Sequence, residues 1–305
     1  MTKVLIATDK PFAKVAADKI KGIIEAAGYK AVFLEKYTDH QDFVDAAKDA
    51  DAIIIRSDKA NKAVIDSAEK LKIVVRAGAG YDNVDLEAAT AKGVVVMNTP
   101  GQNSNAVAEL ALGMMVYQAR NQFNGSSGTE LKDKTLGIHA YGNVGKNVAR
   151  IAKGFGMKVI AFDPFVSADD IKKDGVEVVD SVEKLYSQSN YVSLHIPAND
   201  KTKNSINYAL LSKMPANAML VNTARKEVID EADMKRLLAD RKDFRYVSDI
   251  APSNAADLAE FSAQVFFTPK KMGAQTSEAN INAGIAAANQ IIAFIEKGDI
   301  GFKVN

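Results

Sequence analysis

A turn with two glycines, placed between a strand and a helix, is the first feature whose residue types and spacing point to chemistry. The segment LGIHAYGNVGKNVARIAKGFGMKVIAFD contains a strand, a turn, an amphipathic helix and a second strand that ends on Asp163. A pyrophosphate can approach the backbone at Gly142, and Gly145 allows the helix to pack closely on the strand. An acid about 18 residues further on accepts hydrogen bonds from a ribose and repels a 2′-phosphate. The spacing predicts a dinucleotide site and favours NAD over NADP.

The turn departs from the usual pattern at its first position, where Ala140 replaces a glycine. Glycine patterns alone are weak evidence, because glycines also end helices and form ordinary turns. Here both strands, the helix and the acid fall at the expected places. The predicted cofactor contacts of this unit are Gly142, Asn143, Val144, Gly145 and Asp163.

Three arginines directly follow apolar strands. Arg56 precedes Ser57, Arg76 precedes Ala77-Gly78, and Arg225 follows LVNTA. Ligands of parallel α/β sheets bind beyond the carboxyl ends of the strands. A guanidinium can bind a carboxylate through two parallel hydrogen bonds, and backbone N–H groups in a glycine-rich turn can hold an anion. The pattern predicts a site for an anionic substrate beside a nicotinamide.

Composition excludes several classes of protein. The 305 residues are 47% hydrophobic and 25% charged, with a net charge of +1, so no long-range field favours nucleic acid or an anionic membrane. No apolar run approaches about 18 residues. Without cysteine there is no disulfide, thiolate zinc site or catalytic thiol, and three histidines make a metal site improbable. We expect a cytoplasmic protein without a metal.

Alternating strand and helix patterns predict two α/β domains, each a doubly wound parallel sheet. A helix over about 103–122 crosses from the first array to the second, and a helix over 277–297 crosses back. The predicted domains are a flavodoxin-like substrate-binding domain over 1–98 and 278–305, and a Rossmann NAD-binding domain over 99–277. A cleft between them is expected to hold cofactor and substrate.

Five blocks, in order along the chain, make a family resemblance specific. They are VVRAGAGYDNVDLEAATAKGVVVMNTPGQNSNAVAELALGMM, the glycine turn unit, SLHIP, LVNTARKEVIDE and GAQTSEAN. The chain resembles the D-isomer-specific 2-hydroxyacid dehydrogenases. The resemblance implies an NAD-dependent enzyme that acts at C2 of a small 2-hydroxy acid. AGAGYDNVD and GQNSNAVAEL favour D-3-phosphoglycerate, oxidised to 3-phosphohydroxypyruvate at the entry to serine synthesis.

The resemblance also assigns roles to residues. Arg225 is expected to bind the substrate carboxylate and polarise the C2 oxygen, with Ala77 and Gly78 as backbone donors to that carboxylate. Arg56, Ser57 and Arg76 are expected on the phosphate side. The remaining cofactor contacts that the resemblance implies are Asn105, Val107, His195, Ile196, Pro197, Thr202, Thr223, Ala224 and Asp249.

The family's acid/base pair is missing. Where the family carries a histidine after Thr-Pro, the chain reads TPKKMGA, and Asn254 stands about where the supporting Glu belongs. A neutral lysine can take the hydroxyl proton, and a Glu beside it would oppose this by stabilising the charged form. The loss of both residues is therefore coherent with a catalytic lysine. If the position of the family's histidine is counted forward from Thr268-Pro269, it falls on Lys270, which we prefer. If it is counted back from Gly273-Ala274, it falls on Lys271.

Further expectations follow. Asp58, where phosphoglycerate enzymes often carry a second Arg, keeps open the reduction of another 2-oxo acid such as glyoxylate or hydroxypyruvate. An inactive NAD-binding regulator is a second alternative. The chain ends about one helix after the last block, which predicts a short form without the family's C-terminal serine-binding domain. A homodimer that pairs through the helix over 103–122 is expected, His139 is assigned to the core, and His40 has no assigned role.

Overall fold

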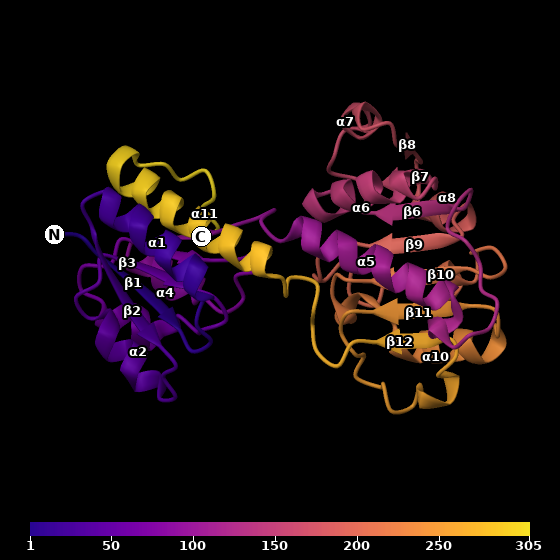
Figure 1. Ribbon diagram of the computed structural model, residues 1–305, viewed down its shortest axis with the longest axis horizontal. Helices are drawn as coiled ribbons and strands as arrows, with labels where there is room; N and C mark the ends of the chain where they lie inside the picture. Colours follow the sequence, from indigo (N-terminus) through magenta and orange to yellow (C-terminus); the bar gives the residue numbers. More distant parts are fainter. The chain divides into compact units, whose positions relative to one another are not determined.

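The computed structural model describes residues 1–305 and divides into two compact units (Figure 1). The first comprises Met1–Asn103 and Thr276–Asn305, and the second comprises Ser104–Gln275. Each is built on one sheet whose strands all pair in parallel. The predicted α/β class with two parallel sheets is confirmed.

The first unit has a five-stranded sheet in the order β2-β1-β3-β4-β5. Its strands are β1 (Lys3–Thr8), β2 (Lys30–Glu35), β3 (Ala52–Ile55), β4 (Ile73–Arg76) and β5 (Val95–Asn98). The run of four apolar residues in β3 is buried throughout, as expected for a strand covered on both faces.

Helices cover both faces of this sheet. On one face, α1 (Lys14–Ala26) and α11 (Ser277–Lys297) lie side by side, and Ile20, Ile24, Ala287 and Ile291 pack against alternate strand residues (Figure 1). The other face is covered by the shorter helices α2 (His40–Ala47), α3 (Lys62–Ser67) and α4 (Leu86–Ala91). The unit is therefore doubly wound.

The second unit has a seven-stranded sheet in the order β12-β11-β10-β9-β6-β7-β8. Its strands are β6 (Thr135–His139), β7 (Lys158–Phe162), β8 (Glu177–Val178), β9 (Tyr191–Leu194), β10 (Met219–Asn222), β11 (Arg245–Ser248) and β12 (Val265–Phe267). Its core has two layers, one on each face of the sheet.

One layer is formed by α5 (Ser104–Ala119), α6 (Asn143–Gly154) and α7 (Ala168–Lys173). The other is formed by α8 (Val182–Ser187), α9 (Tyr208–Leu211) and α10 (Glu231–Asp240). Short 3₁₀ turns lie at Asn121–Phe123, Lys226–Val228 and Ala259–Phe261. The helix predicted over 103–122 ends at Ala119, because three residues after Arg120 adopt left-handed backbone, with φ from 50 to 57°.

Strand register brings the segments after the strands to one edge in each unit. In the second sheet, Leu194 pairs with His139 and Asn222, and Asn222 pairs with Ser248. The loops after β6, β9, β10 and β11 therefore leave the sheet side by side. In the first sheet, Ile55 pairs with Arg76, so the loops after β3 and β4 begin next to each other.

No helix is both long enough and apolar enough to span a bilayer. No group of three or more His, Cys, Asp or Glu side chains is arranged to hold a metal ion.

Candidate functional site

The glycine turn leaves the N-terminus of α6 open. Gly142 is the N-cap, and no side chain bonds the first N–H groups of the helix. A Cβ added at Gly142 would meet nothing within 4 Å, so the space above this N-terminus is accessible. At Gly145 a Cβ would lie 2.5 Å from the carbonyl oxygen of Ala140, so only glycine lets α6 pack this closely on the turn. Open N–H groups at a helix N-terminus suit a phosphate.

Ala140 adopts the backbone conformation that a glycine would adopt without strain. Its φ is +80°, and its N–H donates to the carbonyl of Phe162 at 2.9 Å. The left-handed region costs an L-residue about 1–2 kcal/mol. At the position of the missing first glycine, the turn therefore holds an alanine in a strained left-handed conformation.

Asp163, directly after β7, fixes the turn from the other side. One carboxylate oxygen accepts the N–H of Tyr141 at 2.6 Å, and the other accepts the N–H groups of Phe165 at 2.7 Å and Val166 at 3.2 Å. A carboxylate has about four acceptor positions, so it can still accept a ribose hydroxyl.

Three buried polar atoms at the ends of neighbouring strands have no hydrogen-bond partner. They are His195 Nε2 after β9, Thr223 Oγ1 after β10 and Asp249 Oδ1 after β11. Buried polar groups normally have partners, because leaving one unsatisfied costs about 1–3 kcal/mol. All three belong to predicted cofactor contacts. Together with the open α6 N-terminus, they fit a bound dinucleotide that supplies the missing partners.

Two other predicted cofactor contacts are already engaged within the chain. The Thr202 hydroxyl donates to the carbonyl of Pro197 at 2.6 Å and shapes the loop after β9, where Ile196 is buried. The Asn105 amide donates to Glu109 and accepts from Arg150, both at 2.6 Å. These bonds give the two side chains structural roles.

The two histidines of this edge are neutral near neutral pH. Burial lowers the pKa of His139 to about 4, and its Nδ1 lies 3.2 Å from the hydroxyl of Tyr186. Burial lowers the pKa of His195 to about 3, with a further contribution from His139. Neither ring changes protonation in the range where a catalytic histidine usually acts.

The turn after β10 is braced by Asn222. Its amide oxygen accepts the N–H of Ala224 at 3.0 Å, and its amide nitrogen donates to the carbonyl of Arg225 at 2.9 Å. The Ser248 hydroxyl donates to the Asn222 carbonyl at 2.9 Å, which ties the turn to β11. Arg225 is exposed, and its Nη1 donates to the carbonyl of Ala224 at 3.0 Å.

The two candidate lysines make different contacts in the structure. Lys271 Nζ donates to the carbonyl of Ala224 at 2.8 Å, the same oxygen that accepts from Arg225. The Lys270 side chain is exposed and makes no hydrogen bond, while its carbonyl accepts from the Thr268 hydroxyl at 2.7 Å. The ammonium of Lys271 and the guanidinium of Arg225 therefore meet at the carbonyl oxygen of Ala224. This contact favours Lys271 as the candidate over Lys270, which the sequence pattern favoured.

Asp249 holds the lysine segment against β11. Its Oδ2 accepts the N–H of Gly273 at 2.8 Å. Burial raises the pKa of Asp249, and the charges of Lys271 and Arg225 oppose this rise. A Cβ at Gly273 would lie 2.8 Å from Asp249 Oδ2 and 3.1 Å from Val107, a predicted cofactor contact on α5. Glycine is therefore required where this segment crosses the strand end.

Asn254 stands about where the resemblance predicts the family's Glu, and its side chain bonds to the start of α10. Its amide nitrogen donates to the carbonyl of Glu231 at 3.1 Å, at the start of α10. No hydrogen bond joins it to either lysine.

In the first unit, the guanidinium of Arg56 is held by its own chain. Nη1 donates to the carbonyls of Lys10 and Pro11 at 3.1 and 3.3 Å, and Nη2 donates to Asn280 Oδ1 on α11 at 2.5 Å. Its Cζ lies 5.1 Å from the centroid of the Phe12 ring. Three of its five N–H donors are used, so two remain for an anion. Ser57 beside it is exposed and makes no side-chain bond.

Asp58 is a buried structural carboxylate. It accepts the N–H of Asp9 at 2.7 Å, the hydroxyl of Tyr37 at 2.6 Å and the N–H of Arg56 at 3.4 Å. These bonds join the ends of β1 and β3 to the loop after β2. Sequence reasoning treated Asp58 only as a missing arginine and overlooked this role.

In the loop after β4, the backbone N–H groups of Ala77 and Gly78, which were expected to bind the substrate carboxylate, already donate within the chain. The N–H of Ala77 donates to the carbonyl of Ile55 at 2.8 Å, and that of Gly78 donates to the carbonyl of Arg76 at 2.9 Å. Neither predicted donor is available without breaking a bond. The next two N–H groups, of Ala79 and Gly80, make no hydrogen bond. The Arg76 side chain folds back over Gly78, with Nε donating to the carbonyl of Arg56 at 3.0 Å.

Comparisons with known proteins agree with this arrangement. Residues 105–269 match the family model described as "D-isomer specific 2-hydroxyacid dehydrogenase, NAD binding domain". An NAD⁺-bound 3-phosphoglycerate dehydrogenase from Entamoeba histolytica superposes with a TM-score of 0.89 and 47% identity, over 100% of this chain and 98% of that one.

Two curated relatives show how far the similarity extends. A D-3-phosphoglycerate dehydrogenase from Methanocaldococcus jannaschii is 37% identical over 82% of this chain and 51% of its own length. A hydroxypyruvate reductase from Thermotoga maritima is 34% identical over 80% of this chain and 84% of its own length. The chain thus spans about half the length of the first of these relatives and most of the second.

Proposed function

The chain belongs to the D-isomer specific 2-hydroxyacid dehydrogenase family and carries its NAD-binding domain, and from this premise we propose that it oxidises D-3-phosphoglycerate to 3-phosphohydroxypyruvate. In this proposal Lys271 replaces the His/Glu pair of the family as acid/base. The observation that carries it is the convergence of Lys271 and Arg225 on the carbonyl of Ala224.

The proposed chemistry needs one cation that stays charged and one amine that exchanges a proton. Arg225 binds the substrate carboxylate and polarises the C2 oxygen, because a guanidinium does not lose its proton in proteins. Lys271, as a neutral amine, takes the proton of the C2 hydroxyl while the C2–O double bond forms. When bound, NAD accepts the hydride that leaves C2. In the reverse direction the Lys271 ammonium returns the proton.

The Ala224 carbonyl gives the amine its orientation. It accepts one N–H of Lys271, so the nitrogen lone pair of the neutral form is directed away from this bond. The neighbouring charge of Arg225 opposes a positive charge at this point, and the carboxylate of Asp249 attracts it. Lys270 has neither contact, so we assign it no catalytic role.

The phosphate and carboxylate of the substrate are assigned to the first unit. Arg56 and Arg76 are proposed to bind the phosphate, and the N–H groups of Ala79 and Gly80 are proposed as donors to the carboxylate. The two remaining donors of Arg56 and the unused N–H groups support this assignment.

The reduction of hydroxypyruvate is a second candidate function. It is favoured by the Thermotoga maritima relative, which bears that name and matches over 84% of its length. The test is the rate of NADH formation or consumption with D-3-phosphoglycerate, D-glycerate, 3-phosphohydroxypyruvate and hydroxypyruvate, for wild type and Arg225→Ala. Higher kcat/KM for the phosphorylated pair supports the main proposal. A preference for the unphosphorylated pair supports the reductase, and NADH binding without turnover of any of the four contradicts both.

We also propose that the protein acts in the cytoplasm as a homodimer, with the end of α5 at the contact. Phe123, just after α5, is 65% exposed although it stacks edge-on against Tyr117 with 5.2 Å between ring centroids. Sedimentation of Phe123→Ser against wild type tests the contact. A dimer that is equally stable in both proteins would exclude the end of α5 from the dimer contact.

A further inference from the structure

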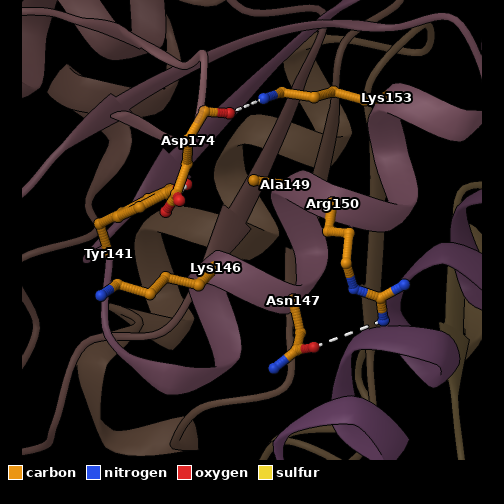
Figure 2. Close-up of a pocket in the computed structure, with 7 residues that line it drawn as sticks. All are labelled: Tyr141, Lys146, Asn147, Ala149, Arg150, Lys153 and Asp174. Atoms are coloured by element: carbon orange, nitrogen blue, oxygen red, sulfur yellow. Dashed lines mark hydrogen bonds between the residues drawn. The ribbon is translucent and has the colours of Figure 1, made fainter. Parts of the chain in front are cut away.

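A cavity of about 350 Å³ lies against α6, and the proposed reaction does not use it. In Figure 2 the side chains that line it surround Ala149. Lys146, Arg150 and Lys153 recur at helical spacing, so they project from one face of α6. The full lining is Tyr141, Lys146, Asn147, Ala149, Arg150, Lys153 and Asp174.

The lining carries an excess of positive charge. It has three cations and a single carboxylate, that of Asp174, and none of the three cations forms an ion pair. The ammonium of Lys146 makes no hydrogen bond. The nearby Asp170 forms its ion pair with Lys173 at 2.7 Å and attracts Lys146 only as a weaker, longer-range contribution. Exposed ion pairs are weak, but clustered unpaired cations around a hollow attract multivalent anions.

The other two cations bond only to neutral groups. Arg150 Nη2 donates to the amide oxygens of Asn105 at 2.6 Å and Asn147 at 3.4 Å. Lys153 Nζ donates to the backbone carbonyl of Asp174 (Figure 2). Their positions are therefore fixed while their charges remain uncompensated, and an anion in the cavity would find them already oriented.

Tyr141 joins this cavity to the glycine turn. Its ring is fully buried, its hydroxyl donates to Asp174 Oδ2 at 3.1 Å, and its backbone N–H donates to Asp163 Oδ2 at 2.6 Å. One residue thus contacts the carboxylate of the cavity and the carboxylate expected to bind the ribose. A displacement of Asp174 would be transmitted to the turn through a rigid side chain.

We propose that this cavity binds a small multivalent anion, such as a diphosphate or a tricarboxylate, and that its occupancy weakens the binding of NADH. An anion placed among the three cations repels the carboxylate of Asp174. The Tyr141 hydroxyl then loses its acceptor, and a buried hydroxyl without a partner destabilises the arrangement of the turn. Linkage requires the reverse effect as well, so bound NADH weakens the binding of the anion by the same factor.

Inorganic pyrophosphate is the probe. NADH fluorescence titrations are made on the full chain at rising pyrophosphate, with ionic strength held constant by potassium chloride to separate binding from screening. In wild type the Kd for NADH should rise about fivefold, near the lower limit of typical allosteric coupling, and then reach a plateau. A rise without a plateau would mean competition at the cofactor's own phosphate site and would overturn the proposal.

Three variants locate the effect. Lys146→Gln with Lys153→Gln should abolish the rise in Kd, whereas Lys213→Gln, which removes an exposed lysine elsewhere in the same unit, should leave it unchanged. Tyr141→Phe should still bind pyrophosphate by calorimetry on NADH-saturated protein but show a flat NADH Kd. The proposal fails if the double variant responds like wild type, or if Tyr141→Phe keeps the full coupling. Circular dichroism checks that each variant is folded.

Discussion

The carboxyl edges of the two sheets differ in how they hold their charged groups. In the first unit, Arg56 and Asp58 are bonded by their own chain, to carbonyls, an amide, a tyrosine and backbone N–H groups. In the second unit, buried polar atoms of His195, Thr223 and Asp249 are left without partners, whereas the unpartnered atoms at the first edge are the neutral hydroxyls of Thr8 and Thr99. The first edge thus holds Arg56 and Asp58 in place through bonds within the chain, whereas the second leaves a carboxylate oxygen of Asp249 and a ring nitrogen of His195 without a partner.

This difference fits two kinds of ligand. A small, highly charged substrate has few contacts, so ordering a flexible arginine on binding would take a large share of its binding energy. A dinucleotide is larger and can satisfy several dispersed groups at once. Unsatisfied atoms lower the stability of the ligand-free unit and raise the gain on binding.

The largest expected effect comes from Gly273, where the second edge has no room for a side chain. Gly273→Ala places a Cβ 2.8 Å from Asp249 Oδ2 and should move the Lys271 segment. A displacement of about 1 Å can cost about 100-fold in kcat. Gly154→Ala on α6, where a Cβ meets nothing within 4 Å, is the control. Steady-state kinetics that show equal kcat for both variants would contradict the role of this contact.

At the first edge, Asn280→Ala should release Arg56 without removing its charge. The Asn280 amide is oriented by its own bond to the Thr276 carbonyl at 2.8 Å, so its oxygen faces Arg56. We expect KM for D-3-phosphoglycerate to rise about tenfold with kcat unchanged, since a charged hydrogen bond contributes about 1.5–3 kcal/mol and part is recovered from water. The KM for D-glycerate, which has no phosphate, should not change. An equal rise for both substrates would indicate general damage to the unit.

Thr223→Val sharpens the contrast at the second edge. Removing a buried hydroxyl that has no partner should raise the free energy of unfolding of the NADH-free protein by about 1 kcal/mol. The substitution should also weaken the binding of NADH about fivefold, because the ligand loses a hydrogen bond to the Thr223 hydroxyl. Thr8→Val removes a similar unpartnered hydroxyl at the end of β1 and should stabilise without changing NADH affinity. Urea unfolding and NADH titration measure both quantities, and a destabilised Thr223→Val protein contradicts the contrast.

The smallest effect is expected at Ala140. Ala140→Gly relieves a left-handed φ of +80° but adds conformational freedom to the unfolded chain. The net gain in stability should be about 0.5 kcal/mol, with NADH affinity unchanged because the turn already has the right geometry. Thermal unfolding resolves this if both proteins are measured together. A clear loss of stability would show that Ala140 is not strained.

Local patterns predicted the features that depend on local sequence. The buried run in β3, the glycine turn and Asp163 could be identified because periodicity and spacing determine them. The sequence also placed Arg225 after a strand of the cofactor unit, where β10 now ends. The membership of the family followed from blocks that are themselves short and contiguous.

The remaining features depend on long-range hydrogen bonds, which local patterns do not encode. The choice between Lys270 and Lys271 depends on which side chain reaches Ala224, a residue 47 positions away from Lys271 in the sequence. Asn280 and Arg56 are 224 positions apart, and no spacing rule joins them. The N–H groups of Ala77 and Gly78 were expected to be open, but the parallel register and a tight turn already use them.

The measurement that tests the central claim most directly is the pH dependence of kcat/KM for D-3-phosphoglycerate oxidation in wild type, Lys271→Met and Lys270→Met. The kcat/KM of wild type should rise with pH as a group that titrates at alkaline pH loses its proton. The profile should show no inflection near ~6.5, because the pKa values of His139 and His195 are lowered to about 4 and about 3. In Lys271→Met, kcat/KM should fall by about 10²–10⁴-fold, the usual contribution of a general base, whereas the kcat/KM of Lys270→Met should match that of wild type. A loss confined to Lys270→Met, or an inflection near ~6.5, would contradict the assignment of Lys271 as the base.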